Sequence, residues 1–333
     1  MTRRTTALLA ALLLTTTAVL ASGCASDGGG GDDDDSTPPN PVPSGSSSPV
    51  NPTGAPSTSV PSGSPSGSPG GSPSGSPTPS GSPGGSPSAS ASPGASGSPA
   101  QGIWHPTPGT AWQWQLTTPV DQSVDVPVYD IDGFENDASV VAALHAKGRK
   151  VICYVNAGAW ETFRPDAGAF PNAVLGSGDG WKGEKWFDVR QLGVLEPLIA
   201  KRFDMCKEKG FDAVEPDLLD AYQNHTGFPI TADDQLAYNK MIAQLAHQRG
   251  LGVALKNDAD QVAQLVDYFD FSVDEQCAEF QECDELTPFI KQGKAVLHVE
   301  YNVPNDQYCA QSAQLDLSSM EKHLNLDAWR EPC

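Results

Sequence analysis

From residue 104 onward, short apolar or alternating runs take turns with longer stretches in which apolar residues recur every three or four positions. The short runs predict β-strands, and the longer stretches predict amphipathic helices. The clearest helices are expected at Val194–Lys209 and Ala232–Arg249, because a glycine follows the last turn of each. Eight strands are predicted: Trp112–Leu116, Pro127–Asp132, Lys150–Asn156, Trp186–Val189, Phe211–Asp217, Gly252–Asn257, Phe269–Glu275 and Ala295–Tyr301.

Strands that alternate with helices predict a parallel sheet. Eight strands within about 190 residues suit a closed (β/α)8 barrel of the TIM type, so we predict one α/β domain over residues 104–333. An open, doubly wound sheet is the alternative on the pattern alone. Its nucleotide-binding versions lose support, because no GxGxxG follows a strand and no GxxxxGK[ST] occurs.

The first hundred residues have a different character. Arg3 and Arg4 precede an apolar stretch that ends in Ala21-Ser22-Gly23-Cys24, which resembles a bacterial lipoprotein signal, although that signal usually has Leu where Ala21 stands. We expect residues 1–23 to be a signal peptide and Cys24 to carry a lipid, with ordinary cleavage and a free secreted protein as the alternative. Residues 24–103 are rich in Ser, Gly and Pro and contain no aromatic ring, which predicts a disordered tether.

The net charge of the domain limits the kinds of molecule that it can bind. The formal net charge is −21, and two Arg with five Asp in residues 1–100 account for −3, which leaves −18 on the domain. Such a domain repels nucleic acid and anionic lipid and attracts cations. We therefore expect no nucleic-acid partner, contact with a membrane only through the lipid anchor, and a cationic partner. The domain is expected at the extracellular face of the cell membrane.

Six cysteines remain in the domain besides Cys24, and disulfides persist in exported proteins. Six cysteines allow 15 pairings. Cys277 and Cys283, six residues apart after a strand end, are the first pair we expect, and two further pairs would complete the set: Cys309–Cys333 and Cys153–Cys206. The domain has no CxxC and no HExxH, so we predict neither a bound metal nor a cofactor.

In a parallel barrel the active site lies at the carboxyl ends of the strands. Because side chains two apart point the same way, Glu215 and Asp217 can face the barrel mouth together, as can Asp130 and Asp132. A single acid at a strand end can instead cap a helix, as Asp258 could. Acids or amides at most strand ends favour a site, with the candidates Asp130, Asp132, Tyr154, Asn156, Glu215, Asp217, Lys256, Asn257, Asp274, Glu275, Glu300 and Tyr301.

Several carboxyl groups at one mouth, without metal ligands, suit the cleavage of a glycosidic bond. One protonated carboxyl helps the leaving oxygen depart, and one ionised carboxylate attacks the sugar or activates water. Crowding separates their pKa values, so both states coexist near neutral pH. Five aromatic side chains are candidates for stacking on sugars, with core packing as the alternative: Trp114, Trp160, Trp181, Tyr154 and Tyr301.

Collinear segments resemble glycoside hydrolase family 114, the endo-α-1,4-polygalactosaminidase family: WQWQL (112–116), VYDID (128–132), KVICYVNAGAWE (150–161), FRPDA (163–167), KGFDAVEPD (209–217), GLGVALKND (250–258), DEQC (274–277) and HVEY (298–301). The resemblance implies a (β/α)8 barrel that cuts α-1,4-linked galactosamine polymers with an Asp after the fifth strand and a Glu after the seventh. These residues are Asp217 and Glu275 here. Leu218 and Asp274 stand where the family often has Asn, which bears on the recognition of sugar hydroxyls.

Together these features predict a monomeric, exported, endo-acting hydrolase of cationic or partly acetylated galactosamine polysaccharide. Asp217 is the predicted nucleophile and Glu275 the general acid, with retention of configuration, and Glu215 is the rival for the acid role. A spacing of about 5 Å (retaining) or about 6.5 to 9.5 Å (inverting) is open to the pair. The remaining strand-end candidates, except Asp274, are assigned to substrate binding. The alternative is a carbohydrate-binding lipoprotein that kept the barrel and lost turnover.

Overall fold

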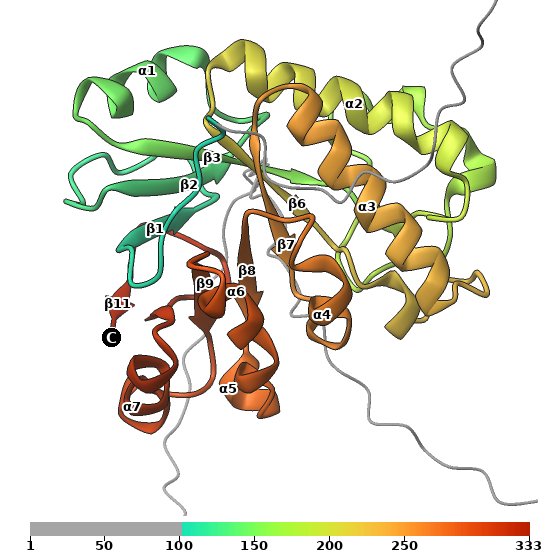
Figure 1. The fold of residues 1–333 in the computed structure, drawn as a ribbon. Helices are drawn as coiled ribbons and strands as arrows, with labels where there is room; N and C mark the ends of the chain where they lie inside the picture. The colour runs from blue at the N-terminus through green and yellow to red at the C-terminus, as the bar shows by residue number, and fades with distance from the viewer. Residues whose placement is uncertain (1–101) are drawn as a thin grey trace, which may run out of the picture. The chain divides into compact units, whose positions relative to one another are not determined.

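The computed structural model describes residues 102–333, so the predicted signal peptide, Cys24 and nearly all of the tether lie outside the described residues. Eight parallel strands form a curled sheet with helices around it (Figure 1). In spatial order they are β1 (Trp112–Gln115), β2 (Val128–Asp132), β3 (Lys150–Asn156), β6 (Ala213–Asp217), β7 (Gly252–Lys256), β8 (Phe271–Glu275), β9 (Val296–Glu300) and β10 (Ser318–Glu321). A short β11 (Glu331–Pro332) pairs antiparallel with β10. The predicted α/β barrel class is confirmed.

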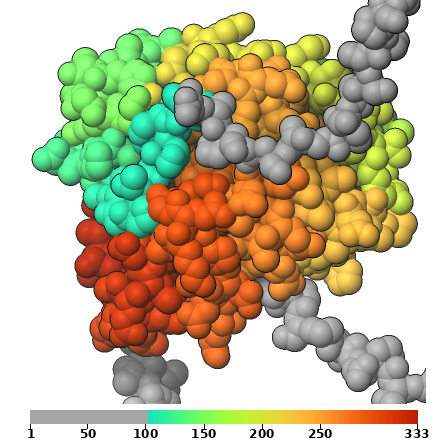
Figure 2. Space-filling model, in the orientation of Figure 1, coloured from blue at the N-terminus to red at the C-terminus, as the bar shows by residue number. Residues whose placement is uncertain are grey.

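The two edges of the sheet are linked by hydrogen bonds outside the strand ladders. Trp112 Nε1 donates to the carbonyl of Ser318 in β10 at 2.8 Å, and the N–H of Leu116 donates to the carbonyl of Leu326 at 3.0 Å. In the space-filling view, the cyan segment that begins the described chain lies against the orange-red segment near its end (Figure 2). These contacts hold the first and the last parallel strand together without a strand ladder between them.

Within residues 102–333, seven α-helices surround the strands: α1 (Ala138–Ala146), α2 (Leu192–Lys209), α3 (Ala232–Gln248), α4 (Val262–Leu265), α5 (Cys277–Phe280), α6 (Thr287–Lys291) and α7 (Asn305–Leu315). The two predicted helices correspond to α2 and α3. Thr231 and Asp234 form a capping box at the start of α3, which satisfies backbone donors there. Gly210 ends α2 at φ 91°, a backbone conformation that favours glycine. No helix among residues 102–333 is long and apolar enough to cross a membrane.

Both faces of the parallel strands are buried, and this explains the nearly continuous apolar runs in the sequence. Side chains such as Ile152 and Phe271 fill the interior of the barrel together with the large rings of Trp112 and Trp114. Their strand neighbours, such as Val151, face outward and pack against the helices. Trp114 is 1 % exposed, so this sugar-stacking candidate belongs to the core.

One predicted barrel strand was wrong. Trp186 does not join the barrel: β5 (Glu184–Trp186) pairs antiparallel with β4 (Ala159–Glu161) in a separate two-stranded arm. The eighth parallel strand is instead β10, whose sequence SSME lacks the apolar run that the prediction required. Asp217 therefore ends the fourth parallel strand rather than the fifth, and Glu275 ends the sixth rather than the seventh.

The three expected disulfides are confirmed. Cys153–Cys206 joins β3 to α2, Cys277–Cys283 closes the loop after β8, and Cys309–Cys333 ties α7 to the C-terminus. The first of them links a barrel strand to the helix that covers it. Each cross-link restricts the unfolded chain and so favours the folded state.

Candidate active site

Three charged side chains converge inside the mouth of the barrel, at the ends of the adjacent strands β6, β7 and β8. Lys256 Nζ lies 2.6 Å from Asp217 Oδ1 and 2.9 Å from Glu275 Oε2. These two carboxylate oxygens are therefore at most about 5.5 Å apart, the sum of the two distances. All three residues are buried, with exposures of 6 % for Asp217, 1 % for Lys256 and 8 % for Glu275.

Each of the two carboxylates also accepts a hydrogen bond from a tyrosine. Tyr154 Oη donates to Asp217 Oδ2 at 2.6 Å, and Tyr301 Oη donates to Glu275 Oε1. Burial, followed by the charge of the adjacent carboxylate, raises the pKa of both tyrosines well above the ordinary value. The two phenols therefore stay protonated and act as fixed donors.

The backbone turns sharply after each of these three strands. Leu218, Asn257 and Gln276 directly follow Asp217, Lys256 and Glu275, and all three have positive φ (61°, 52° and 67°). This left-handed conformation is unfavourable for residues other than glycine. Strained backbone of this kind is typical of functional sites. Here it occurs directly after each of the three strands that carry Asp217, Lys256 and Glu275.

The turns also supply backbone hydrogen bonds to the site. The N–H of Leu218 donates to Asp217 Oδ1 at 2.8 Å, and Asn257 Oδ1 accepts from the N–H of Glu275 at 3.0 Å. Gly158 packs directly on the carbonyl of Leu218, where a Cβ would lie 1.8 Å from the oxygen. A glycine is therefore required at position 158 for the turn after β6 to fit.

A second pair of carboxyl groups lies deeper in the barrel. Asp130 and Glu215 are fully buried, and they lie close enough together that the charge of Glu215 contributes to the raised pKa of Asp130. Lys256 Nζ is 3.4 Å from Glu215 Oε1. Burial raises the pKa of Asp130 well above its ordinary value and raises the pKa of Glu215 to about 7. The deep pair therefore holds a proton at neutral pH.

Several other predicted site residues are bonded within the fold. Asp132 accepts two hydrogen bonds from Arg164, at 3.0 and 2.7 Å. Asn156 Oδ1 accepts from the N–H groups of Gly158 and Ala159, at 3.1 and 2.7 Å, and shapes the turn after β3. Glu300 is fully buried beside His298, at 2.9 Å, on the outer side of β9. The structure thus brings together seven of the candidates: Asp130, Tyr154, Glu215, Asp217, Lys256, Glu275 and Tyr301.

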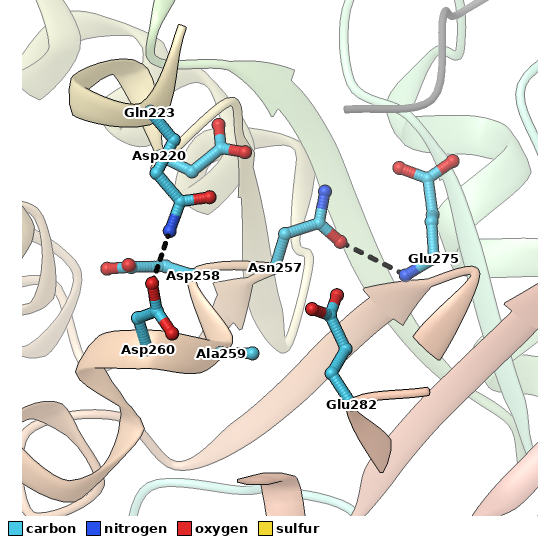
Figure 3. A pocket seen from close by; sticks show the side chains of 8 residues that line it. All are labelled: Asp220, Gln223, Asn257, Asp258, Ala259, Asp260, Glu275 and Glu282. Carbon is cyan, nitrogen blue, oxygen red and sulfur yellow. Dashed lines mark hydrogen bonds between the residues drawn. The ribbon is translucent and has the colours of Figure 1, made fainter. Parts of the chain in front are cut away.

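Beside Glu275 the surface is hollowed by an acidic pocket (Figure 3). Asp258 is buried there and accepts from Tyr222 Oη at 3.2 Å and from Asn239 Nδ2 at 2.9 Å, and burial raises its pKa to about 9. Its side chain caps no helix, contrary to the alternative considered for it. The pocket is lined by Asp220, Gln223, Asn257, Asp258, Ala259, Asp260, Glu275 and Glu282.

The sequence prediction missed three of the acids in this pocket. Asp220, Asp260 and Glu282 lie in the connections after the strand ends, Asp260 in a short 3-10 helix, where neither apolar alternation nor strand-end position identifies them. Their spacing after the strands was the signal that could have found them: Asp220 lies three residues beyond Asp217, and Asp260 lies four beyond Lys256.

A further acidic pair comes from the arm on the other side of the site. Burial raises the pKa of Glu184 to about 9 and also raises that of Asp179, and the charge of Asp217 contributes to both shifts. The N–H of Trp181 donates to Asp179 Oδ1 at 3.0 Å, which holds this half-buried indole near the pair. Acidic side chains therefore flank Asp217 and Glu275 on two sides.

Within residues 102–333, one group of metal-ligand side chains comes close together: Cys277, Cys283 and His298. The two cysteines form a disulfide, so they offer no thiolate to a metal.

A parallel eight-stranded barrel with two close carboxyl groups at its strand ends has the architecture of a glycoside hydrolase. The model of "Glycoside-hydrolase family GH114" matches residues 94–333, and the chain belongs to this family. It is a glycoside hydrolase.

Two solved structures resemble the chain over most of their length. Ega3 of Aspergillus fumigatus, in complex with galactosamine, is 37 % identical, with a TM-score of 0.65 over 70 % of this chain and 99 % of that one. The glycoside hydrolase domain of PelA from Pseudomonas aeruginosa shares the fold at 14 % identity, with a TM-score of 0.52 over 67 % of this chain and 98 % of that one.

A protein of Deinococcus radiodurans, described as uncharacterized, is 35 % identical over 140 residues. That match covers 40 % of this chain and 43 % of the relative, so the chain spans less than half of that relative's length.

Proposed function

We propose that the protein is an exported, endo-acting hydrolase of α-1,4-linked galactosamine-containing polysaccharide, with Asp217 as nucleophile, Glu275 as general acid and retention of configuration. The observation that carries the proposal is the spacing of at most about 5.5 Å between an oxygen of Asp217 and one of Glu275. Retaining pairs lie about 5 to 5.5 Å apart, whereas inverting pairs need about 6.5 to 9.5 Å for a water molecule.

In the first step Asp217 attacks the anomeric carbon, and Glu275 gives its proton to the leaving glycosidic oxygen. The bond between sugar carbon and leaving oxygen breaks as the ester to Asp217 forms. In the second step Glu275 takes a proton from water, which attacks the anomeric carbon and releases Asp217 as a carboxylate. The hydrogen bonds from Tyr154 and Tyr301 hold the two carboxyl groups in one orientation.

The position of Glu215 favours Glu275 as the acid. Glu215 is fully buried beneath Asp217, so a leaving oxygen has no path to it in the described structure. Glu275 instead borders the acidic pocket through which a sugar could approach (Figure 3). Glu215 then affects the site through its charge rather than by transferring a proton to the sugar.

The electrostatics of the site support a cationic amino-sugar substrate. The pocket beside Glu275 is lined by five acidic residues, and the Asp179–Glu184 pair lies on the other side. A galactosamine residue carries an ammonium group that such surroundings attract. The similarity to Ega3, solved with galactosamine, supports the same sugar.

The experiment that tests this proposal is digestion of de-N-acetylated α-1,4-galactosamine oligomers by the full mature chain. We expect new reducing ends, internal products by mass spectrometry, and the α-anomer as first product by NMR. Oligomers of β-1,4-linked glucosamine carry the same charge and serve as the matched control. Equal cleavage of both would contradict the linkage specificity, and a β-anomer as first product would contradict retention.

Export with a lipid at Cys24 is part of the proposal. The sequence of residues 1–24 supports it, and three disulfides in the described domain suit an oxidising compartment. The variant Cys24→Ala should leave the detergent phase in a partitioning assay and keep its specific activity. Retention of the variant in the detergent phase would rule out lipidation at this residue.

A further inference from the structure

Lys256 is enclosed on all sides by groups of the protein. It lies on β7, between the strands that carry Asp217 and Glu275, and its side chain is 1 % exposed. Its ammonium group has three N–H donors, and three carboxylates surround it, at 2.6, 2.9 and 3.4 Å. The ring of Trp114 lies 5.0 Å away. The buried ammonium of Lys256 thus faces carboxyl groups of the protein, which favours an electrostatic role over the substrate-binding role that the sequence predicted.

We propose that Lys256 is a positioning residue that acts as the shared counter-ion of Asp217 and Glu275 throughout the reaction. The proposal rests on the retaining mechanism above. When the first step begins, Asp217 is a carboxylate and Glu275 has taken up the proton that it transfers. After the first step Asp217 is a neutral ester and Glu275 is a carboxylate. One negative charge has moved from one side of Lys256 Nζ to the other.

The geometry suits this movement of charge. Nζ lies 2.6 Å from Asp217 and 2.9 Å from Glu275, so the ammonium contacts the negative charge at both ends of the step without moving. Electrostatic groups that are already in place for the charge of the transition state lower the barrier, because they need no reorganisation. Two carboxyl groups this close would otherwise repel each other whenever both were ionised.

The surroundings keep Lys256 charged. Burial would lower the pKa of this lysine, but the negative charges of Asp217, Glu275 and Glu215 outweigh that effect and raise it well above the ordinary value. The titratable groups around the ammonium come from five segments: Asp130 of β2, Tyr154 of β3, Glu215 and Asp217 of β6, Glu275 of β8, and Tyr301 just after β9.

The variant Lys256→Met tests the proposal in the full mature chain. We expect kcat to fall at least about 10²-fold. We expect the bell-shaped pH profile of kcat/KM to move upward by roughly 1 to 2 pH units, because both carboxyl groups ionise less readily without the adjacent cation. KM for the cationic oligomer should not rise, since the variant removes a positive charge that opposes the ammonium of the sugar. A lysine that bound the sugar would give the opposite result, a raised KM.

A matched control separates this role from a general effect on stability. Lys294 is also a buried lysine, and its Nζ donates to the carbonyls of Val266 and Phe269, away from the site. Lys294→Met should lower the melting temperature and leave the pH profile of the folded enzyme unchanged. A similar unchanged profile for Lys256→Met would overturn the proposal.

A second variant keeps the test decisive if Lys256→Met fails to fold. The double variant Lys256→Met/Glu215→Gln removes one positive and one negative charge, and it should fold and still show the shifted profile. If neither Lys256 variant folds whereas Lys294→Met does, the lysine is a structural counter-ion and the positioning role is wrong. An inactive wild-type chain would instead refute the proposed function, so the two failures are distinguishable.

Discussion

Two groups of buried or half-buried acids in this barrel differ in how their charges are compensated. In the first, Asp132, Glu161 and Asp166 are held by Arg164 and Arg202 through ion pairs of 2.7 to 3.2 Å. In the second, a single ammonium group serves all four carboxyl groups: Asp130, Glu215, Asp217 and Glu275 around Lys256.

The difference separates a structural network from a chemical one. A planar guanidinium group can donate two parallel hydrogen bonds to one carboxylate. The carboxylates of the first group can therefore find hydrogen-bond donors without taking up a proton. Its residues tie the arm to α2. In the second group four carboxyl groups share one cation, whereas in the first group three share two. Burial raises the pKa of Asp130 and Glu215 in the second group, so this group holds a proton near neutral pH. Perturbed pKa values of this kind are typical of catalytic sites.

The largest effect is expected from the two carboxyl groups at the mouth. Asp217→Asn and Glu275→Gln should each lower kcat at least about 10³-fold, because each removes one of two required roles. Both variants should keep their fold, since the remaining carboxyl groups still outnumber the ammonium. Reducing-end assays and circular dichroism check this, with Asp204→Asn on exposed α2 surface as the control. Turnover near the wild-type rate in either variant would remove that residue from the mechanism.

Substitutions in the arginine network should instead change the free energy of unfolding. Arg202→Met leaves Glu161 and Asp166 without this cation, and we expect a loss of about 3 to 5 kcal/mol in the free energy of unfolding. Arg249→Met breaks an ion pair with the half-exposed Asp204 and should cost no more than about 1 kcal/mol. Urea denaturation measures both. Similar losses for the two variants would mean that the buried network contributes no more to the free energy of unfolding than a surface ion pair does.

The raised pKa values predict how stability depends on pH. Burial raises the pKa of Glu215 to about 7 and that of Asp258 to about 9, above their values in an unfolded chain. The folded protein therefore keeps protons that the unfolded chain releases, and stability should fall as the pH rises from about 5 to about 9. The variant Asp258→Asn should show a weaker fall in melting temperature over this range. A melting temperature that rises with pH would contradict these shifts.

The smallest effect is expected from the long-range electrostatic field of the acidic domain, outside the active site. The rate on a fully de-N-acetylated polymer should fall a few-fold between low salt and 0.5 M salt, because screening weakens the attraction between an acidic domain and distant ammonium groups. A fully acetylated polymer should show almost no dependence. Initial rates over a series of salt concentrations test this, and equal slopes for the two polymers would show that long-range attraction has no part in binding.

The sequence by itself determined the fold class and much of the site. Alternating strands and helices predicted the barrel, and the spacing of two residues correctly placed Asp217 above Glu215 on one face of β6. Cysteine spacing led to the pair Cys277–Cys283, and the structure also contains the two pairs that were expected to complete the set. These features succeed because they depend on which residues are near in the chain or which face of a strand is apolar.

Only the tertiary structure decided which neighbours the acids have. The strand β10 carries too little apolar signal to be recognised, and its place is set by closure of the barrel against β1. Asp132 and Asp217 look alike at their strand ends, yet one lies against Arg164 and the other against Lys256. Those partners come from segments 32 and 39 residues away. Hydrophobic periodicity records burial but carries no information about such contacts, so the difference between a structural acid and a reactive one appears only when the chain is folded.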